Sequence, residues 1–141
     1  MSEKLDVVGI GNAMVDAIIP SNQSEIEKHE INRDSMNLID EGLKNNLHDS
    51  YSIREMAGGG SLGNSMFGIT SFGGNGSFIG KIKNDEIGIY LQKDMVREGL
   101  KFPLGFTSPD ISTGCCTIFV EEDGTRTMCT FLGAGTLIGP E

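Results

Sequence analysis

A short apolar run near the start of the chain, residues 6–11 (Asp-Val-Val-Gly-Ile-Gly), ends in a glycine turn. Runs of this length that are rich in β-branched residues and bounded by a turn are typical of strands buried in a parallel sheet. After a turn at residues 57–60, residues 61–69 show helical spacing, and residues 77–82 form another strand-like run with a helical segment behind it. This β-α-β-α order predicts an α/β fold built on a parallel sheet.

Capping residues mark where two of the expected helices begin. Asp40 precedes a helix expected over residues 41–47, because its side chain suits the N-cap position. Asn84 or Asp85 precedes a longer amphipathic helix, and Gly99 is expected to end it.

The C-terminal third of the chain predicts a β-hairpin. Two strand-like runs, residues 115–120 and 125–131, flank the tetrapeptide Glu-Glu-Asp-Gly at residues 121–124. An Asp-Gly turn between such runs is a strong hairpin signal. Together with strand-like segments at residues 14–20 and 35–39, the hairpin is expected to form a small sheet that projects from the α/β body.

The charge of the chain excludes several classes of partner. With 11 basic and 20 acidic residues among 141, the formal net charge is −9 and the pI is about 4.6. Such a chain repels phosphate backbones and acidic membranes, so we expect no nucleic-acid or membrane partner. The first residues do not resemble a secretory leader and no apolar run reaches the ~18 residues of a membrane span, so we expect a cytoplasmic protein of one domain.

The three cysteines, Cys115, Cys116 and Cys129, form no Cys-x-x-Cys pair. The two histidines, His29 and His48, lie far from one another in the sequence. This spacing does not indicate a zinc site, and we expect reduced, packed thiols.

Polar residues follow the first strand where ligands bind in open α/β sheets. Gly9 and Gly11 begin a dinucleotide-binding pattern, but Met14 stands at the third glycine position, which disfavours a nicotinamide-dependent oxidoreductase. Asn12 and Asp16 place an amide and a carboxylate beyond the strand, a pair suited to a vicinal diol such as that of a sugar. Two turn-capping polar residues are the alternative interpretation.

A second candidate site lies at Gly58, Gly59 and Gly60, before a helix that carries Asn64. Glycines allow close approach of a ligand to the backbone, and a helix N-terminus presents free N–H groups. No Gly-Lys-Ser/Thr follows, so this is not a P-loop. An ordinary loop is the alternative.

Three further features of the C-terminal third remain ambiguous from the residues alone. Arg126, in the second hairpin strand, faces either an anion or solvent. Residues 121–123 are acidic and are interpreted as a solvated hairpin tip instead of a metal site, and residues 133–135 (Gly-Ala-Gly) as a turn.

Taken in order, these features resemble the ribokinase/PfkB family of ATP-dependent sugar and nucleoside kinases, and especially its adenosine-kinase-like branch. Six segments carry the resemblance, namely residues 6–16, 35–40, 57–64, 78–88, 112–116 and 126–134. The resemblance implies a ribokinase-like parallel Rossmann-type core with a small β-sheet lid, inserted as residues of about 14–20, 35–56 and 110–132.

The resemblance also implies roles for individual residues. Asn12 and Asp16 are expected to bind substrate hydroxyls, and Gly59, Gly60 and Asn64 to close around the same sugar. From the lid side, Met36 and Cys116 are expected to line the pocket, while Arg126 is a weaker candidate near the phosphoryl path.

The chain departs from the family pattern most in its length, since such kinases run to roughly twice this size. In the family, a Gly-Ala-Gly-Asp segment supplies the catalytic aspartate, whereas residues 133–135 here are followed by Thr136. We therefore expect no catalytic residue within these 141 residues, and binding of ATP and Mg²⁺ mainly by a C-terminal half that the chain lacks.

Two functional hypotheses follow from the sequence. The first is the substrate-binding N-terminal part of an ATP-dependent sugar or nucleoside kinase, which transfers the γ-phosphoryl group to a primary hydroxyl and is inactive as an isolated piece. The second is a non-catalytic module that binds a nucleoside or sugar, or that assembles as a homodimer through the exposed edge of its lid sheet.

Overall fold

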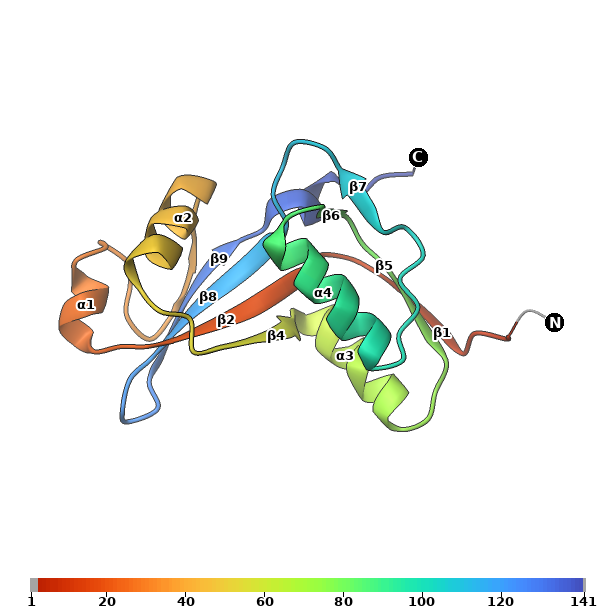
Figure 1. The fold of residues 1–141 in the computed structure, drawn as a ribbon. Coiled ribbons are helices and arrows are strands. Elements are labelled where there is room, and N and C mark those ends of the chain that lie inside the picture. The colour runs from red at the N-terminus through yellow and green to blue at the C-terminus, as the bar shows by residue number, and fades with distance from the viewer. Residues whose placement is uncertain (1–2, 141) are drawn as a thin grey trace.

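The computed structural model describes residues 3–140 (Figure 1). Its elements are β1 (Val7–Ile10), β2 (Met14–Pro20), α1 (Gln23–Glu27), β3 (Met36–Leu38), α2 (Glu41–Ser50), β4 (Glu55–Gly59), α3 (Ser61–Ser71), β5 (Gly76–Ile79), β6 (Ile82–Lys83), α4 (Glu86–Arg97), β7 (Phe106–Ser108), β8 (Gly114–Val120), β9 (Arg126–Phe131) and the 3₁₀-helix η1 (Gly133–Leu137). Among these described residues, no helix is both long and apolar enough to cross a membrane.

The predicted hairpin and the two earlier strand segments do form one sheet, in the order β3-β9-β8-β2-β4. Strands β8 and β9 are the antiparallel hairpin, while β2 pairs in parallel with β8, and β3 in parallel with β9. We call these five strands the lid sheet. In Figure 1 the lid sheet extends away from α3 and α4, with α1 and α2 beside its far end.

One face of the lid sheet is buried and the other is open. Ile19 and Phe119 point to the buried face, where they pack with Ile26 of α1 and Leu47 of α2. Side chains one residue out of phase point the opposite way, because a strand alternates its side chains between two faces. Asp16 therefore lies on the open face, where it is half-buried.

The α/β body contains the parallel pair β1 and β5, with α3 and α4 packed nearby. Its core includes Met66 of α3, Phe78 of β5, and Leu91 and Met95 of α4, all fully buried. A second parallel pair, β6 with β7, adds two short strands. Parallel pairing in the body confirms the α/β fold predicted from the β-α-β-α order.

The expected helix start at Asp40 is confirmed, and of the two candidates Asn84 and Asp85 it is Asp85 that caps α4. The Asp40 side chain accepts a hydrogen bond from the Leu43 N–H at 2.8 Å, and Asp85 accepts one from the Gly88 N–H at 2.8 Å. Each satisfies an N–H group that has no partner inside its helix. Gly99 follows the end of α4 with φ of +83°, a conformation that favours glycine.

Residues 57–60 are not the turn that the glycines suggested. Residues 57–59 belong to β4, which pairs antiparallel with β2, and only Gly60 turns, with φ of +79°. Gly59 lies where a Cβ would stand 2.3 Å from the Asp16 carboxyl carbon, and Gly58 where one would stand 2.7 Å from the Phe67 ring. Glycine is needed at these two positions of the strand because it leaves space for neighbouring side chains. Composition alone does not reveal this requirement.

Four other features of the structure differ from what the sequence indicated. The run at residues 77–82 is two elements, β5 and β6, and residues 133–137 form a 3₁₀-helix instead of a turn. Strand β7 has no counterpart in the prediction. Strand β1 forms as predicted, but only Gly9 in it is buried, because the face that carries Val8 and Ile10 has no covering element among residues 3–140.

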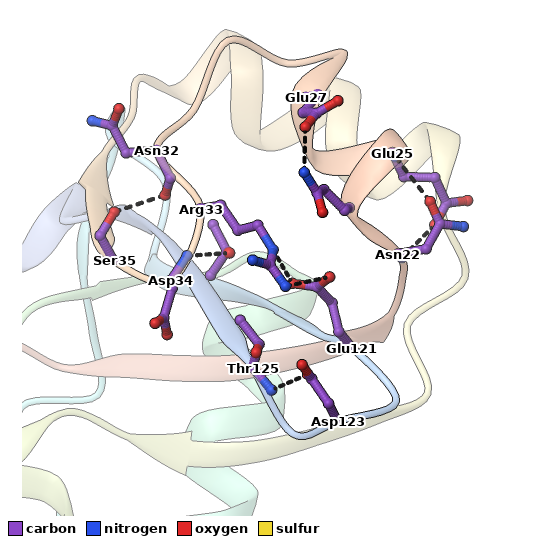
Figure 2. A network of polar contacts seen from close by, with 12 residues as sticks. Asn22, Glu25, Glu27, Asn32, Arg33, Asp34, Ser35, Glu121, Asp123 and Thr125 are labelled. Carbon is purple, nitrogen blue, oxygen red and sulfur yellow. Dashed lines mark hydrogen bonds and ion pairs between the residues drawn. The ribbon is translucent and has the colours of Figure 1, made fainter.

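The tip of the hairpin is tied to the loop that precedes β3 (Figure 2). Arg33 donates two hydrogen bonds to the Glu121 carboxylate, at 2.8 and 3.1 Å. The Asp34 N–H bonds to the Thr127 hydroxyl at 3.0 Å. Glu121 thus acts as an ion-pair partner, and these contacts hold β3 against β9 at the edge of the sheet.

Candidate functional site

Asp16 lies in the middle of β2, next to β4, the neighbouring strand of the sheet that ends in Gly58 and Gly59. The Cβ position of Gly59 is within 2.5 Å of all three atoms of the Asp16 carboxyl group, so no side chain other than hydrogen fits beneath it. Gly59 therefore contributes to the site by leaving room for Asp16. The sequence predicted that both residues serve one site, and the structure brings them together.

A row of side chains crosses the open face of the lid sheet at Asp16. The strand registers pair Asp16 with Cys116, Cys116 with Thr130, and Thr130 with Leu38. The Thr130 hydroxyl lies 3.4 Å from the Cys116 sulfur. Cys116 is therefore next to Asp16 in the sheet, and Thr130 is an additional member of the row that the sequence analysis missed.

The next row along the same face contains Met36. It pairs with Met128, which pairs in turn with Ile118 and then Ile18. Met36 is 54% exposed, and two intervening strands separate it from β2. It is on the same face of the sheet as Asp16 but at the far edge, and it does not line the strand-end hollow described below.

A hollow of about 510 Å³ lies where β1, α3 and the lid sheet meet. We call it the strand-end hollow. Its lining includes Asn12 and Gly60, two of the predicted residues, together with Met14, Thr130 and Leu132. Thr130 belongs to the Asp16 row, and Met14 lies two residues before Asp16 on the same face of β2, so the hollow adjoins the row that contains the carboxylate.

Met14 shows what the sequence analysis missed at this hollow. It was considered only as the residue that breaks a glycine pattern, yet it is two residues before Asp16 and shares its face of β2. Its Cγ stands 3.2 Å from the Cβ position of Gly60. The alternation of side chains between the two faces of β2 could have identified Met14 as a residue on the same face as Asp16.

Asn64 and Arg126 lie apart from the strand-end hollow. Asn64 is exposed in the first turn of α3, where its backbone N–H bonds to the Gly60 carbonyl at 2.9 Å. Arg126 pairs with Val120 at the tip end of the hairpin, is exposed, and lies four residues along β9 from Thr130. Four residues of strand span roughly 13 Å, so Arg126 does not join the other predicted residues.

Burial sets the electrostatics of the site. It raises the pKa of Asp16, because a charged carboxylate loses hydration there. The pKa of the neighbouring Cys116 thiol is raised too, first by burial and then by the negative charge of Asp16, while its hydrogen bond with Thr130 acts in the opposite direction. A carboxylate in this setting gains from any ligand that donates hydrogen bonds to it.

The thiols behave as the sequence predicted. Cys115, Cys116 and Cys129 are free and buried. Burial raises the pKa of Cys115 to about 12 and that of Cys129 to about 11. Such groups remain protonated at neutral pH and are poor nucleophiles.

A larger hollow, of about 600 Å³, lies elsewhere, between α2 and the start of α4. Glu41, Asp49, Asp85 and Glu86 surround it, with Lys44 and His48. It opens behind the buried face of the lid sheet and contains none of the predicted site residues. We assign the candidate site to the strand-end hollow, because Asn12 and Gly60 line it and because its lining residues Met14 and Thr130 share the open face of the lid sheet with the half-buried Asp16 carboxylate.

Comparison with known proteins places the chain in a family. The model of the pfkB family carbohydrate kinases matches residues 4–138. No curated protein matches the chain.

Two bacterial structures share both fold and sequence with the chain. The adenosine kinase from Sinorhizobium meliloti is 36% identical, with a TM-score of 0.85 over 97% of this chain and 42% of that chain. A probable sugar kinase from Rhizobium etli CFN 42 is 33% identical, with a TM-score of 0.84 over 96% of this chain and 41% of that one.

The adenosine kinase from Anopheles gambiae, crystallised with P1,P4-di(adenosine-5) tetraphosphate, has the same fold. It is 23% identical, with a TM-score of 0.82 over 95% of this chain and 41% of its own. The chain therefore spans about two fifths of the length of these structures. The family match over residues 4–138, together with the parallel core and the lid sheet, establishes that the chain belongs to the pfkB family of carbohydrate kinases and has the ribokinase-like α/β fold.

Proposed function

We propose that the chain supplies the acceptor-binding part of an ATP-dependent sugar or nucleoside kinase. The observation that carries the proposal is the Asp16 carboxylate, half-buried on the open face of the lid sheet, beside a hollow and above a glycine that leaves it room. Membership in a kinase family and the likeness to an adenosine kinase and a probable sugar kinase support the choice of acceptor.

In this proposal Asp16 accepts hydrogen bonds from two neighbouring hydroxyls of the sugar ring. Asn12, which lines the strand-end hollow, adds an amide that both donates and accepts. Cys116, Met36 and Met14 supply apolar contacts from the open face. Holding the ring at several points orients its primary hydroxyl for transfer, and orientation is a large part of catalysis in phosphoryl transfer.

In the same proposal, ATP supplies the phosphoryl group and Mg²⁺ neutralises its charge, as in such kinases. Among residues 3–140, no group of three or more His, Cys, Asp or Glu side chains is arranged to hold a metal ion. We propose that ATP and Mg²⁺ are bound mainly by polypeptide equivalent to the part of the related kinases that lies outside the match. Residues 133–135 precede Thr136 in a 3₁₀-helix and supply no catalytic aspartate.

Calorimetric titration of the purified chain with adenosine and with ribose tests the proposal. We expect saturable binding of at least one of them. The Asp16→Asn variant should weaken it by about tenfold or more, because hydrogen bonds to a charged group contribute about 1.5–3 kcal/mol. Asp110→Asn makes the same change at an exposed position away from the hollow and should leave the affinity unchanged.

Circular dichroism and thermal unfolding establish in parallel that each variant is folded. Absence of binding by the folded chain, or equal affinity of the Asp16→Asn variant, refutes the proposal. A measurable rate of ATP-dependent phosphorylation by the pure chain contradicts the assignment of the phosphoryl-transfer groups to residues beyond it.

A further inference from the structure

A buried carboxylate of α4 bonds to the backbone of β4. Asp94 is 5% exposed, and its Oδ2 accepts a hydrogen bond from the Gly58 N–H at 2.8 Å. Its other oxygen accepts a hydrogen bond from Arg97, whose side chain is 66% exposed. Burial of a carboxylate is costly unless hydrogen bonds replace its hydration, so these two bonds are what permits a carboxylate at this position.

A second side chain of α4 bonds to the same strand. The Tyr90 hydroxyl donates to the Met56 carbonyl at 2.5 Å. Tyr90 and Asp94 are four residues apart, so they share one face of α4 and lie about 6 Å apart along its axis. Met56 and Gly58 are two residues apart, which corresponds to about 6.5 Å along a strand. Because the two spacings match, α4 holds β4 at two successive points.

Both bonds lie on the edge of β4 that faces away from β2. Strand β4 is the last strand in the order β3-β9-β8-β2-β4, so among residues 3–140 only β2 pairs with it. Backbone groups alternate sides along a strand, and the N–H groups of Ala57 and Gly59 therefore point toward β2 while that of Gly58 points to α4. Side chains of α4 thus take the place of a neighbouring strand along this edge.

Successive glycines of β4 lie against two different carboxylates. A Cβ on Gly58 would stand 2.8 Å from Oδ2 of Asp94, and a Cβ on Gly59 would stand 2.4 Å from Oδ1 of Asp16. These two Cβ positions are on opposite faces of the strand, because side chains alternate between faces. The backbone of β4 is therefore packed between Asp94 and Asp16, and a displacement of Gly58 must also displace Gly59, its covalent neighbour.

The same segment continues into the wall of the strand-end hollow. Gly60 follows Gly59, turns the chain with φ of +79°, and lines the hollow. Its carbonyl accepts the hydrogen bond from the Asn64 N–H at 2.9 Å in the first turn of α3. A shift of residues 58–60 would change both the space beside Asp16 and one wall of the hollow.

We propose that Asp94 is a positioning residue for the acceptor-binding site. Its carboxylate, bonded to the Gly58 N–H, holds residues 58–60 where Gly59 accommodates Asp16 and Gly60 lines the hollow. Tyr90 supports the same strand through the Met56 carbonyl. Asp94 acts through the backbone of β4 and not by contact with a sugar. The inference rests on the proposed function, because the site that Asp94 positions is the one assigned to the acceptor.

Two replacements at position 94 separate the hydrogen bond from the charge. Asp94→Ala removes both, whereas Asp94→Asn removes the charge and keeps an oxygen that can accept from the Gly58 N–H. Glu98→Ala is the matched control. It removes a carboxylate that bonds to the same Arg97, at 3.3 Å, but that is half-exposed and bonds to no group of β4 among residues 3–140.

Two measurements without sugar test the positioning. In Asp94→Ala the Ala57 and Gly59 amides should exchange hydrogen at least about tenfold faster than in the native chain, because β4 opens locally from β2, while the amides of β8 change little. Burial raises the pKa of Asp16, and NMR titration of its carboxyl group should show a pKa nearer the ordinary value in Asp94→Ala, since a displaced Gly59 admits water. Asp94→Asn and Glu98→Ala should match the native chain in both measurements.

Calorimetry with adenosine and with ribose then measures the consequence for binding. Asp94→Ala should weaken binding at least about fivefold, and Asp94→Asn and Glu98→Ala should stay within about twofold of the native affinity, because only the alanine at position 94 removes the hydrogen bond to β4. Where Asp94→Ala does not fold, Tyr90→Phe takes its place. It removes the other bond to β4 and should change amide exchange and the pKa of Asp16 in the same directions.

The proposal is overturned if folded Asp94→Ala keeps the native exchange at Ala57 and Gly59 and the native pKa of Asp16. It is also overturned if Asp94→Asn changes them as much as Asp94→Ala does, since the charge and not the hydrogen bond would then be responsible. Native affinity for sugar in Asp94→Ala contradicts it as well. If the native chain binds neither adenosine nor ribose, the proposed function fails, whereas the two measurements without sugar still decide the role of Asp94.

Discussion

Replacing Gly59 with alanine tests the packing on which the candidate site depends. The added Cβ would stand 2.3 Å from the Asp16 carboxyl carbon and 2.4 and 2.5 Å from its oxygens. Ordinary van der Waals contact begins at 3.4 Å, so the carboxyl group must move by about 1 Å. Overpacking of this kind costs about 1–3 kcal/mol, partly offset by the roughly 0.4–1 kcal/mol that alanine gains by restricting the unfolded chain.

The expected net loss for Gly59→Ala is about 1–2 kcal/mol. For a chain of this size that corresponds to a fall in Tm of roughly 3–6 °C. Urea unfolding at 25 °C and thermal unfolding measure it. The Gly68→Ala variant is the control, because nothing lies within 4 Å of its Cβ position in α3. Alanine should stabilise that helix by about 0.5–1 kcal/mol.

A double-mutant cycle with Asp16→Ala isolates the contact. With the carboxylate removed, Gly59→Ala should cost nothing or stabilise slightly, so the coupling between the two positions should be about 1–2 kcal/mol. Independent sites add within about 0.3–0.5 kcal/mol. Additivity within that range, or a Gly59→Ala variant as stable as the Gly68→Ala control, would refute the reasoning that Gly59 is required for the position of Asp16.

Three further predictions concern other parts of the molecule. Burial, followed by the nearby Lys44 charge, lowers the pKa of His48 below its usual 6.5, so on acidification the unfolded chain binds a proton at this histidine before the folded chain does. The free energy of unfolding, measured by urea titration, should therefore fall as the pH drops below 6.5. The His48→Gln variant should show a smaller fall over the same pH range. Burial raises the pKa of Cys115 from 9.0 to about 12, so in the folded chain this thiol should react with Ellman's reagent roughly a thousandfold more slowly than an exposed thiol. Rapid labelling of Cys115 in the native protein would contradict its burial. Arg33 and Glu121 should show favourable coupling in a double-mutant cycle that shrinks in molar salt, and a coupling insensitive to salt would argue against an ion pair.

The local signals in the sequence predicted most of the elements. The Asp-Gly turn predicted the β8–β9 hairpin, and Asp40 and Asp85 predicted two helix starts. These signals are reliable because a turn or cap residue determines the conformation of the few residues next to it in the chain. Glycine was the least reliable signal. Residues 57–59 were interpreted as a turn, although they form a strand whose glycines accommodate Asp16 and Phe67.

The residues of the predicted site are not all brought together. Asp16, Gly59 and Cys116 lie close to one another on the open face, and Asn12 and Gly60 line the adjacent hollow, whereas Asn64 and Arg126 do not line it. That these residues bind a substrate stays a prediction. Thr130 was missed, because the pairing that places it beside Cys116 joins residues fourteen apart in the chain. No spacing rule carries that information.

By itself the sequence determined the alternation of its strands, the caps of its helices, its negative charge and its resemblance to a kinase family. Only the tertiary structure decided which strands pair, and therefore that Asp16, Cys116 and Thr130 form one row while Arg126 lies roughly 13 Å along its strand from Thr130. It also decided that β1, whose residues are typical of a buried strand, exposes Val8 and Ile10. The physical reason is that side-chain pattern is a local property of the chain, whereas burial depends on which other segments lie against it.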